Sequence, residues 1–198
     1  MKLSMKTNEK LPLAVEIIKN GGIIIFPTET AFGIGCRMDS KKAVARLFKI
    51  RKRPKFQATP VLVGSREMAQ SYLQPIDEKA QALMRAYWPG ALTLILPCRP
   101  EKVLPLVRGG GQTLGVRMPN HEIPLSIIYS INVPILGPSA NFHGRPTPYE
   151  FTDLDPELIK LVDLVLPGEC SLKKASTVLD CSVKPWKIIR QGAVDTMI

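Results

Sequence analysis

One stretch near the amino terminus constrains the fold more than any other: residues 21–35, which read GGIIIFPTETAFGIG. The apolar run at 23–26 is typical of a buried strand. Pro27 follows, and we expect it to end the strand because proline has no N–H to donate to a sheet ladder. The stretch therefore predicts a buried strand that stops where polar residues begin.

Three polar side chains stand at the predicted strand end, where Thr28, Glu29 and Thr30 supply two hydroxyls and a carboxylate. Gly33 and Gly35 follow and would let the backbone approach a ligand closely. This arrangement is a common way to build a site in an α/β protein. An ordinary strand–turn–strand unit with a solvated turn has the same pattern, and only the rest of the chain decides between the two.

The length and composition indicate a globular protein with its own core. The 198 residues are enough for one domain, which we assign to 1–198, and the 45% of hydrophobic residues is ordinary for a soluble chain. No apolar run approaches the ~20 residues that span a bilayer. The amino terminus, MKLSMKTNEK, has no apolar signal-peptide segment. We therefore expect a cytoplasmic protein that does not associate with a membrane.

The cysteines and histidines do not predict a metal site. Cys36, Cys98, Cys170 and Cys181 are scattered without a C-x-x-C pair, and the chain has 2 histidines. Reduced thiols are expected where no signal peptide is present. We predict neither a disulfide framework nor a bound zinc ion.

The charge of the chain favours an anionic partner. The formal net charge is +10, which suits a nucleotide, a phosphate metabolite or a nucleic acid, although it also serves solubility. The segment 41–55 holds 8 lysines and arginines and no acid. A solvated helix face usually mixes both signs, so a polyanion explains this run better. We expect a helix at 40–52 that Pro54 ends, which leaves the last basic side chains in a loop.

Helix and strand patterns alternate along the chain and strands dominate later. Beyond the elements above, helices are predicted at 9–20, from 65, at 77–88, at 124–131 and from 155, and strands at 31–38, 60–63, 91–96, 113–118, 133–136, 161–166, 176–180 and 187–190. This order indicates one α/β domain with a mixed sheet.

A second predicted strand ends in the same way as the first. The sequence GPSAN at 137–141 follows the apolar run at 133–136. It is not a G-x-S-x-G nucleophile elbow, because Asn141 occupies the last position. The glycines at 109–111 either offer backbone N–H groups to an anion or form a flexible connection, and no P-loop sequence occurs.

Seven short motifs together resemble the YrdC/TsaC family of threonylcarbamoyl-AMP synthases. They occur in the family's order and cover nearly the whole chain: PTETAFGIG, RKRP, WPGALTLIL, VRMPNH, PSAN, STVLD and IIRQGAV. The chain ends soon after the last motif and so resembles the short, single-domain members. The resemblance implies an α/β fold in which a twisted open mixed sheet, flanked by helices, encloses a basic concave cavity.

The resemblance also implies a reaction. Enzymes of this family are nucleotidyltransferases that condense L-threonine, bicarbonate and ATP to threonylcarbamoyl-AMP and diphosphate. The product serves N6-threonylcarbamoylation of adenosine 37 in tRNA, which a separate transferase complex completes. Charge builds on phosphate oxygens in this reaction, so arginine forks and hydroxyl donors suit it. We expect ATP to carry Mg²⁺, since the sequence has no convincing carboxylate cluster.

Site residues follow from the family's motifs, position by position. The expected catalytic residues are Arg51, Arg53, Ser139 and Asn141. The expected ATP contacts are Arg53, Thr113, Ser139, Asn141, Thr147 and Arg190. The expected threonine contacts are Thr28, Thr30, Arg117 and Ser176, with Arg117 pairing with the substrate carboxylate.

Three positions depart from the family's usual residues. Arg51 stands where lysine is usual, so the positive charge comes either from it or from Lys49 or Lys52. Phe32 replaces a tyrosine and lacks its hydroxyl. His143 stands where serine is usual, and we expect it in a surface loop.

Two other functions are compatible with parts of the sequence. YrdC-like domains occur in hydrogenase-maturation carbamoyltransferases, but these are much longer and carry C-x-x-C zinc motifs. The basic run also permits an RNA-binding ribosome or tRNA factor without catalysis. Aromatic residues make up only 6% of the chain and form no stacking series, which disfavours a pure RNA-binding module.

Overall fold

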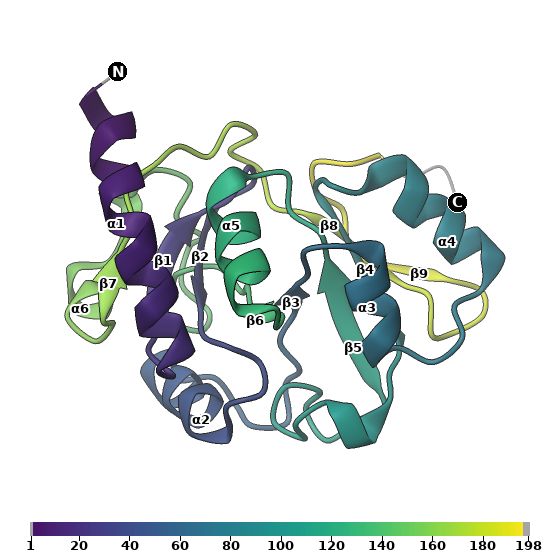
Figure 1. Cartoon of the computed structure of the whole chain (residues 1–198). Coiled ribbons are helices and arrows are strands. Elements are labelled where there is room, and N and C mark those ends of the chain that lie inside the picture. Colours follow the sequence, from purple (N-terminus) through teal and green to yellow (C-terminus); the bar gives the residue numbers. More distant parts are fainter. Residues whose placement is uncertain (1, 196–198) are drawn as a thin grey trace.

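The computed structural model describes residues 2–195, with side chains from residue 10 onward, and contains two hydrogen-bonded sheets with helices around them (Figure 1). The strands are β1 (Ile24–Pro27), β2 (Phe32–Gly35), β3 (Val61–Leu62), β4 (Leu92–Pro97), β5 (Thr113–Arg117), β6 (Ile135–Leu136), β7 (Leu164–Val165), β8 (Thr177–Asp180) and β9 (Lys187–Arg190). The α-helices are α1 (Lys2–Lys19), α2 (Lys41–Ile50), α3 (Arg66–Tyr72), α4 (Glu78–Tyr87), α5 (Glu122–Ile131) and α6 (Pro156–Ile159), and short 3₁₀ turns lie at Pro100–Lys102 and Phe151–Asp153.

Both sheets are mixed, as the sequence predicts for the fold class. The smaller sheet has the order β2-β1-β7 and the larger one β6-β3-β5-β4-β8-β9. In the smaller sheet β1 pairs antiparallel with β2 and parallel with β7. In the larger sheet the β3–β5 and β4–β8 pairs are parallel and the others antiparallel. The division into two sheets is not visible in the sequence.

The first stretch of the sequence folds as a tight hairpin. Pro27 is the last residue of β1, paired with Phe32 of β2, rather than lying beyond the strand. Gly35 is required for packing and not for a ligand, because a Cβ there would lie 2.2 Å from the carbonyl oxygen of Leu136. The expectation that Gly35 makes room for a ligand is therefore wrong.

The segment after β6 connects the two sheets. Ile34 N–H donates to the carbonyl of Pro138 at 2.9 Å, and Ala140 N–H donates to that of Phe32 at 2.8 Å. An isolated bridge also pairs Gly33 with Ser139. This pairing places residues 138–140 beside β2, although more than 100 residues separate the two segments in sequence.

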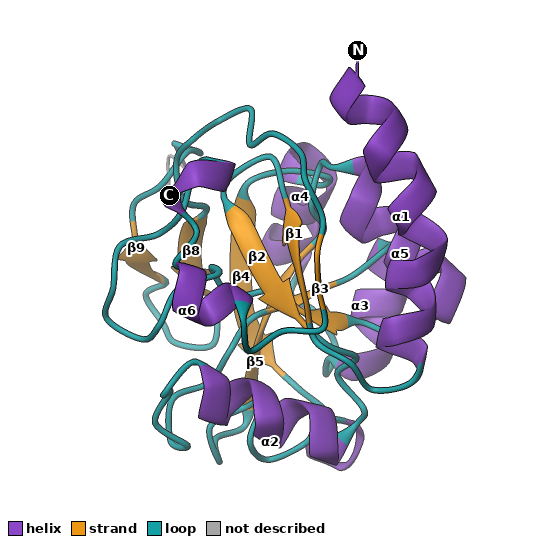
Figure 2. Cartoon of the chain, turned by 90° about the vertical axis from the view of Figure 1, so that its left-hand side faces the viewer, coloured by secondary structure: helices purple, strands orange, loops and turns teal. Residues whose placement is uncertain are grey.

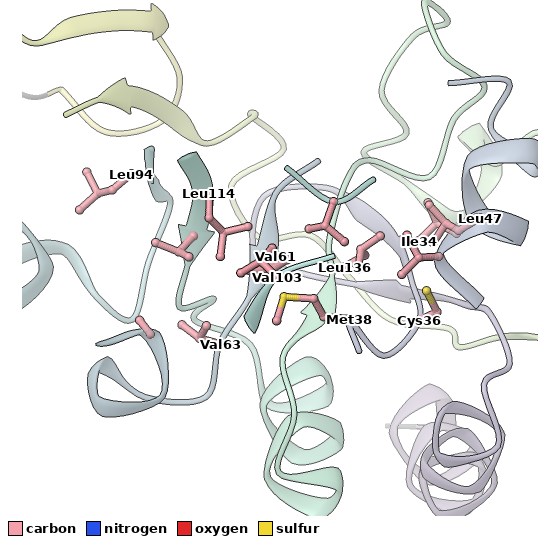
Figure 3. Close-up of a cluster of buried hydrophobic side chains, with 14 of the residues drawn as sticks. Ile34, Cys36, Met38, Leu47, Val61, Val63, Leu94, Val103, Leu114 and Leu136 are labelled. Atoms are coloured by element: carbon pink, nitrogen blue, oxygen red, sulfur yellow. The ribbon is translucent and has the colours of Figure 1, made fainter. Parts of the chain in front are cut away.

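The helices cover the sheets on more than one side. Figure 2 shows α1 and α5 side by side on one flank, and there Ile18, Phe26 and Ile127 share a buried cluster. α2 lies elsewhere in the same view, and its Leu47 packs near Ile34 in the larger core cluster (Figure 3). Burial of these apolar stripes is the main force that holds helices to sheets.

The starts of α2 and α4 agree with the sequence prediction, whereas α1 begins at Lys2 instead of residue 9 and the end of α2 differs. Ser40 caps α2 and Asp77 caps α4, each by accepting a backbone N–H. α2 ends at Ile50, before the predicted Lys52, and Pro54 does not end it. The turn comes from Lys52, which has the left-handed φ of 53°. Arg51 is consequently the C-cap residue, and the chain changes direction directly after it.

A search of the described helices found none with both the length and the apolar character needed to cross a bilayer.

Candidate active site

A cavity of about 370 Å³ lies where the hairpin turn, the segment after β6 and the strands β4, β5, β8 and β9 meet. Four arginines line it: Arg51, Arg53, Arg117 and Arg190. All the predicted site residues line this cavity except Asn141. The fold thus brings residues from distant motifs to one place, while their individual roles stay predictions.

Arg51 is the most unusual group at the cavity, because it is a buried cation without an acidic partner. The residue is 3% exposed. Its Nε donates to the carbonyl oxygen of Asn141 at 3.0 Å and its Nη2 to Asn141 Oδ1 at 3.2 Å, whereas Nη1 is buried with no hydrogen-bond partner. Burial, and then the charge of Arg53, lowers the pKa of Arg51 to about 10, so it remains protonated at neutral pH.

Ser139 and Asn141 form the support of this arginine. Ser139 Oγ donates to Asn141 Oδ1 at 2.6 Å, and Asn141 Nδ2 donates to the carbonyl oxygen of Arg145. His143 N–H donates to the carbonyl oxygen of Arg51 at 2.8 Å, so the loop holds Arg51 by backbone and side chain. Asn141 therefore acts from behind the cavity wall, whereas Ser139 lines the cavity.

Arg53 holds the shape of the basic loop. Its Nε donates to the carbonyl oxygen of Gln57 at 3.2 Å and its Nη2 to that of Ala58, and burial lowers its pKa. Arg53 is half-buried and lines the cavity, and its hydrogen bonds order the loop that contains it.

The remaining basic residues of 41–55 do not line this cavity. Lys49 and Lys52 are exposed, and Lys52 Nζ lies 5.2 Å from the ring centroid of Phe142. Arg46 forms an ion pair with Asp163 at 2.5 Å. The basic side chains of 41–55 therefore divide between this cavity, which Arg51 and Arg53 line, and the rest of the surface, and a polyanionic partner for the run stays a prediction. Of the three candidates for the charge at the family's lysine position, Arg51 is the one that reaches the cavity.

A second part of the cavity wall, its Arg117 end, is built by the hairpin turn and β5. Arg117 Nη1 donates to Thr30 Oγ1 at 2.8 Å and Nε to the carbonyl oxygen of Gly90 at 3.1 Å. Its Nη2 lies 2.6 Å from Glu29 Oε2, and both side chains are buried. The Thr28 and Thr30 hydroxyls are 2.9 Å apart. Here, unlike at Arg51, a carboxylate balances the buried guanidinium.

Ser176 and Arg190 close a third side. Arg190 Nε donates to the carbonyl oxygen of Ser176 and Nη2 to its Oγ, both at 3.0 Å. Ser176 Oγ also lies 2.9 Å from Thr93 Oγ1. Thr93 lines the cavity and the sequence reasoning missed it, although a hydroxyl in an otherwise apolar strand was a usable signal.

Three more threonines face the cavity. Thr113 begins β5, and Thr147 is held by the neighbouring Pro148, whose carbonyl oxygen accepts from Phe32 N–H at 3.0 Å. Thr59 was not predicted. Its Oγ1 is buried with no hydrogen-bond partner, and no feature of the sequence distinguishes it from an ordinary residue before a strand.

The other departures and the glycine run lie as follows. Phe32 is fully buried, with its ring 6.0 Å from that of Phe151 in an edge-to-face contact. His143 is exposed and does not line the cavity. The N–H groups of Gly109, Gly110 and Gly111 donate to carbonyl oxygens of their own loop. An anion nest at this run is therefore excluded as long as the loop keeps this fold.

The site residues do not fit a metal ion held by the protein. Among the side chains that the structure describes, no three of the types His, Cys, Asp and Glu are grouped to ligate a metal. Glu29 is the carboxylate in contact with a cavity residue, and it is committed to Arg117. The cavity instead offers guanidinium and hydroxyl donors, which suit phosphate and carboxylate groups.

The family comparison agrees with this chemistry. The Sua5/YciO/YrdC family model, described as Telomere recombination, matches residues 16–192. The threonylcarbamoyl-AMP synthase of Bacillus subtilis is 33% identical over 195 residues, which cover 96% of this chain and 56% of that protein.

Solved structures extend the likeness to three dimensions. Pyrococcus abyssi Sua5 in complex with L-threonine matches with a TM-score of 0.85 and 34% identity, over 92% of this chain and 54% of that one. Escherichia coli YciO matches with a TM-score of 0.84 and 28% identity, over 94% of this chain and 91% of that one. The chain spans about half the length of the curated synthases it matches first and nearly the whole length of YciO.

Proposed function

Because the chain belongs to the Sua5/YciO/YrdC family, we propose that it is a threonylcarbamoyl-AMP synthase that condenses L-threonine, bicarbonate and ATP. The observation that carries this proposal is the cavity itself. One end holds a buried, unbalanced guanidinium at Arg51, and the other holds Arg117 beside two threonine hydroxyls. A triphosphate suits the first end and a zwitterionic amino acid suits the second.

The proposed reaction has two steps. The amine of threonine attacks bicarbonate, and water leaves, which gives a carbamate. A carbamate oxygen then attacks the α-phosphorus of ATP, and diphosphate leaves with the electron pair of the broken P–O bond. No protein nucleophile is needed, so catalysis rests on positioning and on donors aimed at phosphate oxygens.

The residues divide between these tasks. Arg51 Nη1, which has no partner in the protein, donates to the reacting phosphate or carbamate, with Asn141 and Ser139 holding Arg51 in place. Arg53, Thr113, Thr147 and Arg190 contact ATP. Thr28, Thr30, Arg117 and Ser176 contact threonine. ATP carries its own Mg²⁺, and the product is consumed by a separate complex that modifies adenosine 37 of tRNA.

The test is the substrate dependence of diphosphate release. The purified protein is incubated with ATP, and L-threonine and bicarbonate are added singly and together. Diphosphate release is expected only with both. Release without threonine would contradict the proposal. RNA binding that weakens steeply with salt, without any ATP turnover, would favour the RNA-binding alternative instead.

A further inference from the structure

Glu29 has no task in the proposed reaction, yet its carboxylate is buried beside the cavity. The residue is 4% exposed and does not line the cavity. Its Oε2 lies 2.6 Å from Arg117 Nη2, but the contact lacks aligned hydrogen-bond geometry, and both carboxylate oxygens are left without a hydrogen-bond partner. A buried carboxylate with unused acceptors calls for an explanation.

The position of Glu29 explains how Arg117 is held. Each nitrogen of Arg117 has a neighbour in the protein: Gly90 at Nε, Thr30 at Nη1 and Glu29 at Nη2. Arg117 lines the cavity and Glu29 does not, so the carboxylate fixes the guanidinium from outside the cavity lining.

The turn itself fixes the direction of two hydroxyls, and the fixed guanidinium occupies one lone pair of the second. Thr28 Oγ1 donates its proton to the carbonyl oxygen of Ala31 at 2.7 Å and accepts from the N–H groups of Thr30 and Ala31, so it has no site left for a ligand. A hydroxyl has only one proton, so in the 2.9 Å contact between Thr28 and Thr30 the donor is Thr30. Thr30 Oγ1 accepts from Arg117 and keeps one lone pair. To a ligand, Thr30 is therefore an acceptor only.

We propose that Glu29 is a positioning residue for the amino-acid end of the cavity. By fixing Arg117 it keeps that guanidinium bonded to Thr30, so that the Thr30 hydroxyl presents its remaining lone pair to an amine or hydroxyl of the ligand while Arg117 receives the ligand's carboxylate. This inference rests on the proposed function, because it takes L-threonine as the ligand of this end.

The test compares Glu29→Gln and Glu29→Asp with the wild type. The KM for L-threonine and the KM for ATP are measured from diphosphate release, and L-threonine binding is measured by calorimetry. Glu29→Gln is expected to raise the threonine KM by about 10-fold or more, the worth of a charge-assisted contact. The ATP KM should stay within about 2-fold, since Arg51 and Arg53 are not in contact with Glu29. Glu29→Asp keeps the charge and should give an intermediate threonine KM.

The matched control is Asp163→Asn. Asp163 also forms an ion pair with an arginine and accepts from the N–H of Ile23 at the start of the same hairpin, but it does not line the cavity. Its loss is expected to lower stability without changing the threonine KM. An equal rise of both KM values in Glu29→Gln, or no rise in either, would overturn the proposal.

Two further outcomes are also decisive. If Glu29→Gln does not fold, Glu29→Asp carries the test alone, and a wild-type threonine KM in that variant overturns the proposal. If the wild type binds L-threonine but releases no diphosphate, the proposed activity fails, while calorimetry on the same variants still decides the role of Glu29. If the wild type binds no L-threonine, both proposals fall.

Discussion

The two ends of the cavity differ in whether a carboxylate balances their buried guanidinium. Arg51 is 3% and Arg117 6% exposed, so both are removed from water to a similar extent. Arg117 is balanced by Glu29, whereas Arg51 meets only neutral oxygens of Asn141 and leaves Nη1 without a partner. The difference indicates that Arg51 keeps its positive charge available for an anion, while the Glu29–Arg117 pair is close to neutral and suits a zwitterion.

The largest expected effect is a loss of stability when the buried arginine of the Arg117 end is replaced. Arg117→Met removes one partner of a buried ion pair and leaves Glu29 charged and alone, which should lower the free energy of unfolding by about 3–5 kcal/mol. Urea denaturation followed by circular dichroism measures the change. A loss below about 1 kcal/mol would contradict the assignment of Glu29 and Arg117 as a buried ion pair.

Arg51→Met should instead lower the activity strongly and change the stability little. The substitution keeps the stem but removes the charge at the phosphate end, so adenylate formation should fall by about 10²-fold or more. The free energy of unfolding should change by no more than about 1 kcal/mol, because the lost hydrogen bonds are offset by the lost burial of a charge. The control is Lys52→Met, the same change in the next residue, whose exposed ammonium lies over Phe142. An active Arg51→Met protein would remove Arg51 from the reaction centre.

Ser139→Ala tests the support of Arg51. The hydroxyl lines the cavity and donates to the oxygen of Asn141 that also accepts from Arg51. Loss of this support should misplace the Arg51 guanidinium and lower the rate by about 10²-fold with the fold retained. Initial rates at saturating substrates measure it, and wild-type rates in this variant would exclude Ser139 from the site.

Arg51→Lys tests whether the phosphate end needs only a positive charge or the planar guanidinium group. Lysine is the family's usual residue here and keeps the charge, but it cannot reproduce both hydrogen bonds to Asn141. We expect activity within about 10-fold of wild type, the worth of about one hydrogen bond. A loss as large as that of Arg51→Met would mean that this cavity is adapted to the guanidinium.

The smallest expected effect concerns Thr59. Its buried Oγ1 has no partner, so Thr59→Val, which keeps the shape, should raise the free energy of unfolding by about 1 kcal/mol. If ATP or bicarbonate forms a hydrogen bond with this hydroxyl, the KM for that substrate should rise by a few-fold in the same variant. Thermal unfolding with and without ATP separates the two effects, and an unchanged melting temperature in the apo protein would mean that Thr59 has a partner in solution.

The sequence predicted the elements and the membership of the site better than the connections between its residues. Local signals sufficed for the starts of α2 and α4 and for the strand before Thr28, because these depend on neighbours in sequence. The family's motifs predicted Arg51, Ser139 and Arg117 as site residues, and all three line one cavity. The ion pair of Glu29 with Arg117 and the pairing of residues 138–140 with β2 join segments far apart in the chain, and no local pattern encodes them. The end of α2 was misplaced because Lys52 turns the chain before Pro54 does.

The central claim is that one cavity joins an amino acid, bicarbonate and a nucleotide, and isotope transfer tests it most directly. The protein is incubated with ATP, L-threonine and ¹³C-bicarbonate, and the nucleotide product is analysed by mass spectrometry. We predict threonylcarbamoyl-AMP that carries the ¹³C label in wild type and Lys52→Met, and greatly reduced labelled product in Arg51→Met. Unlabelled AMP or ADP as the only nucleotide product, or the same product in all three proteins, would contradict the account.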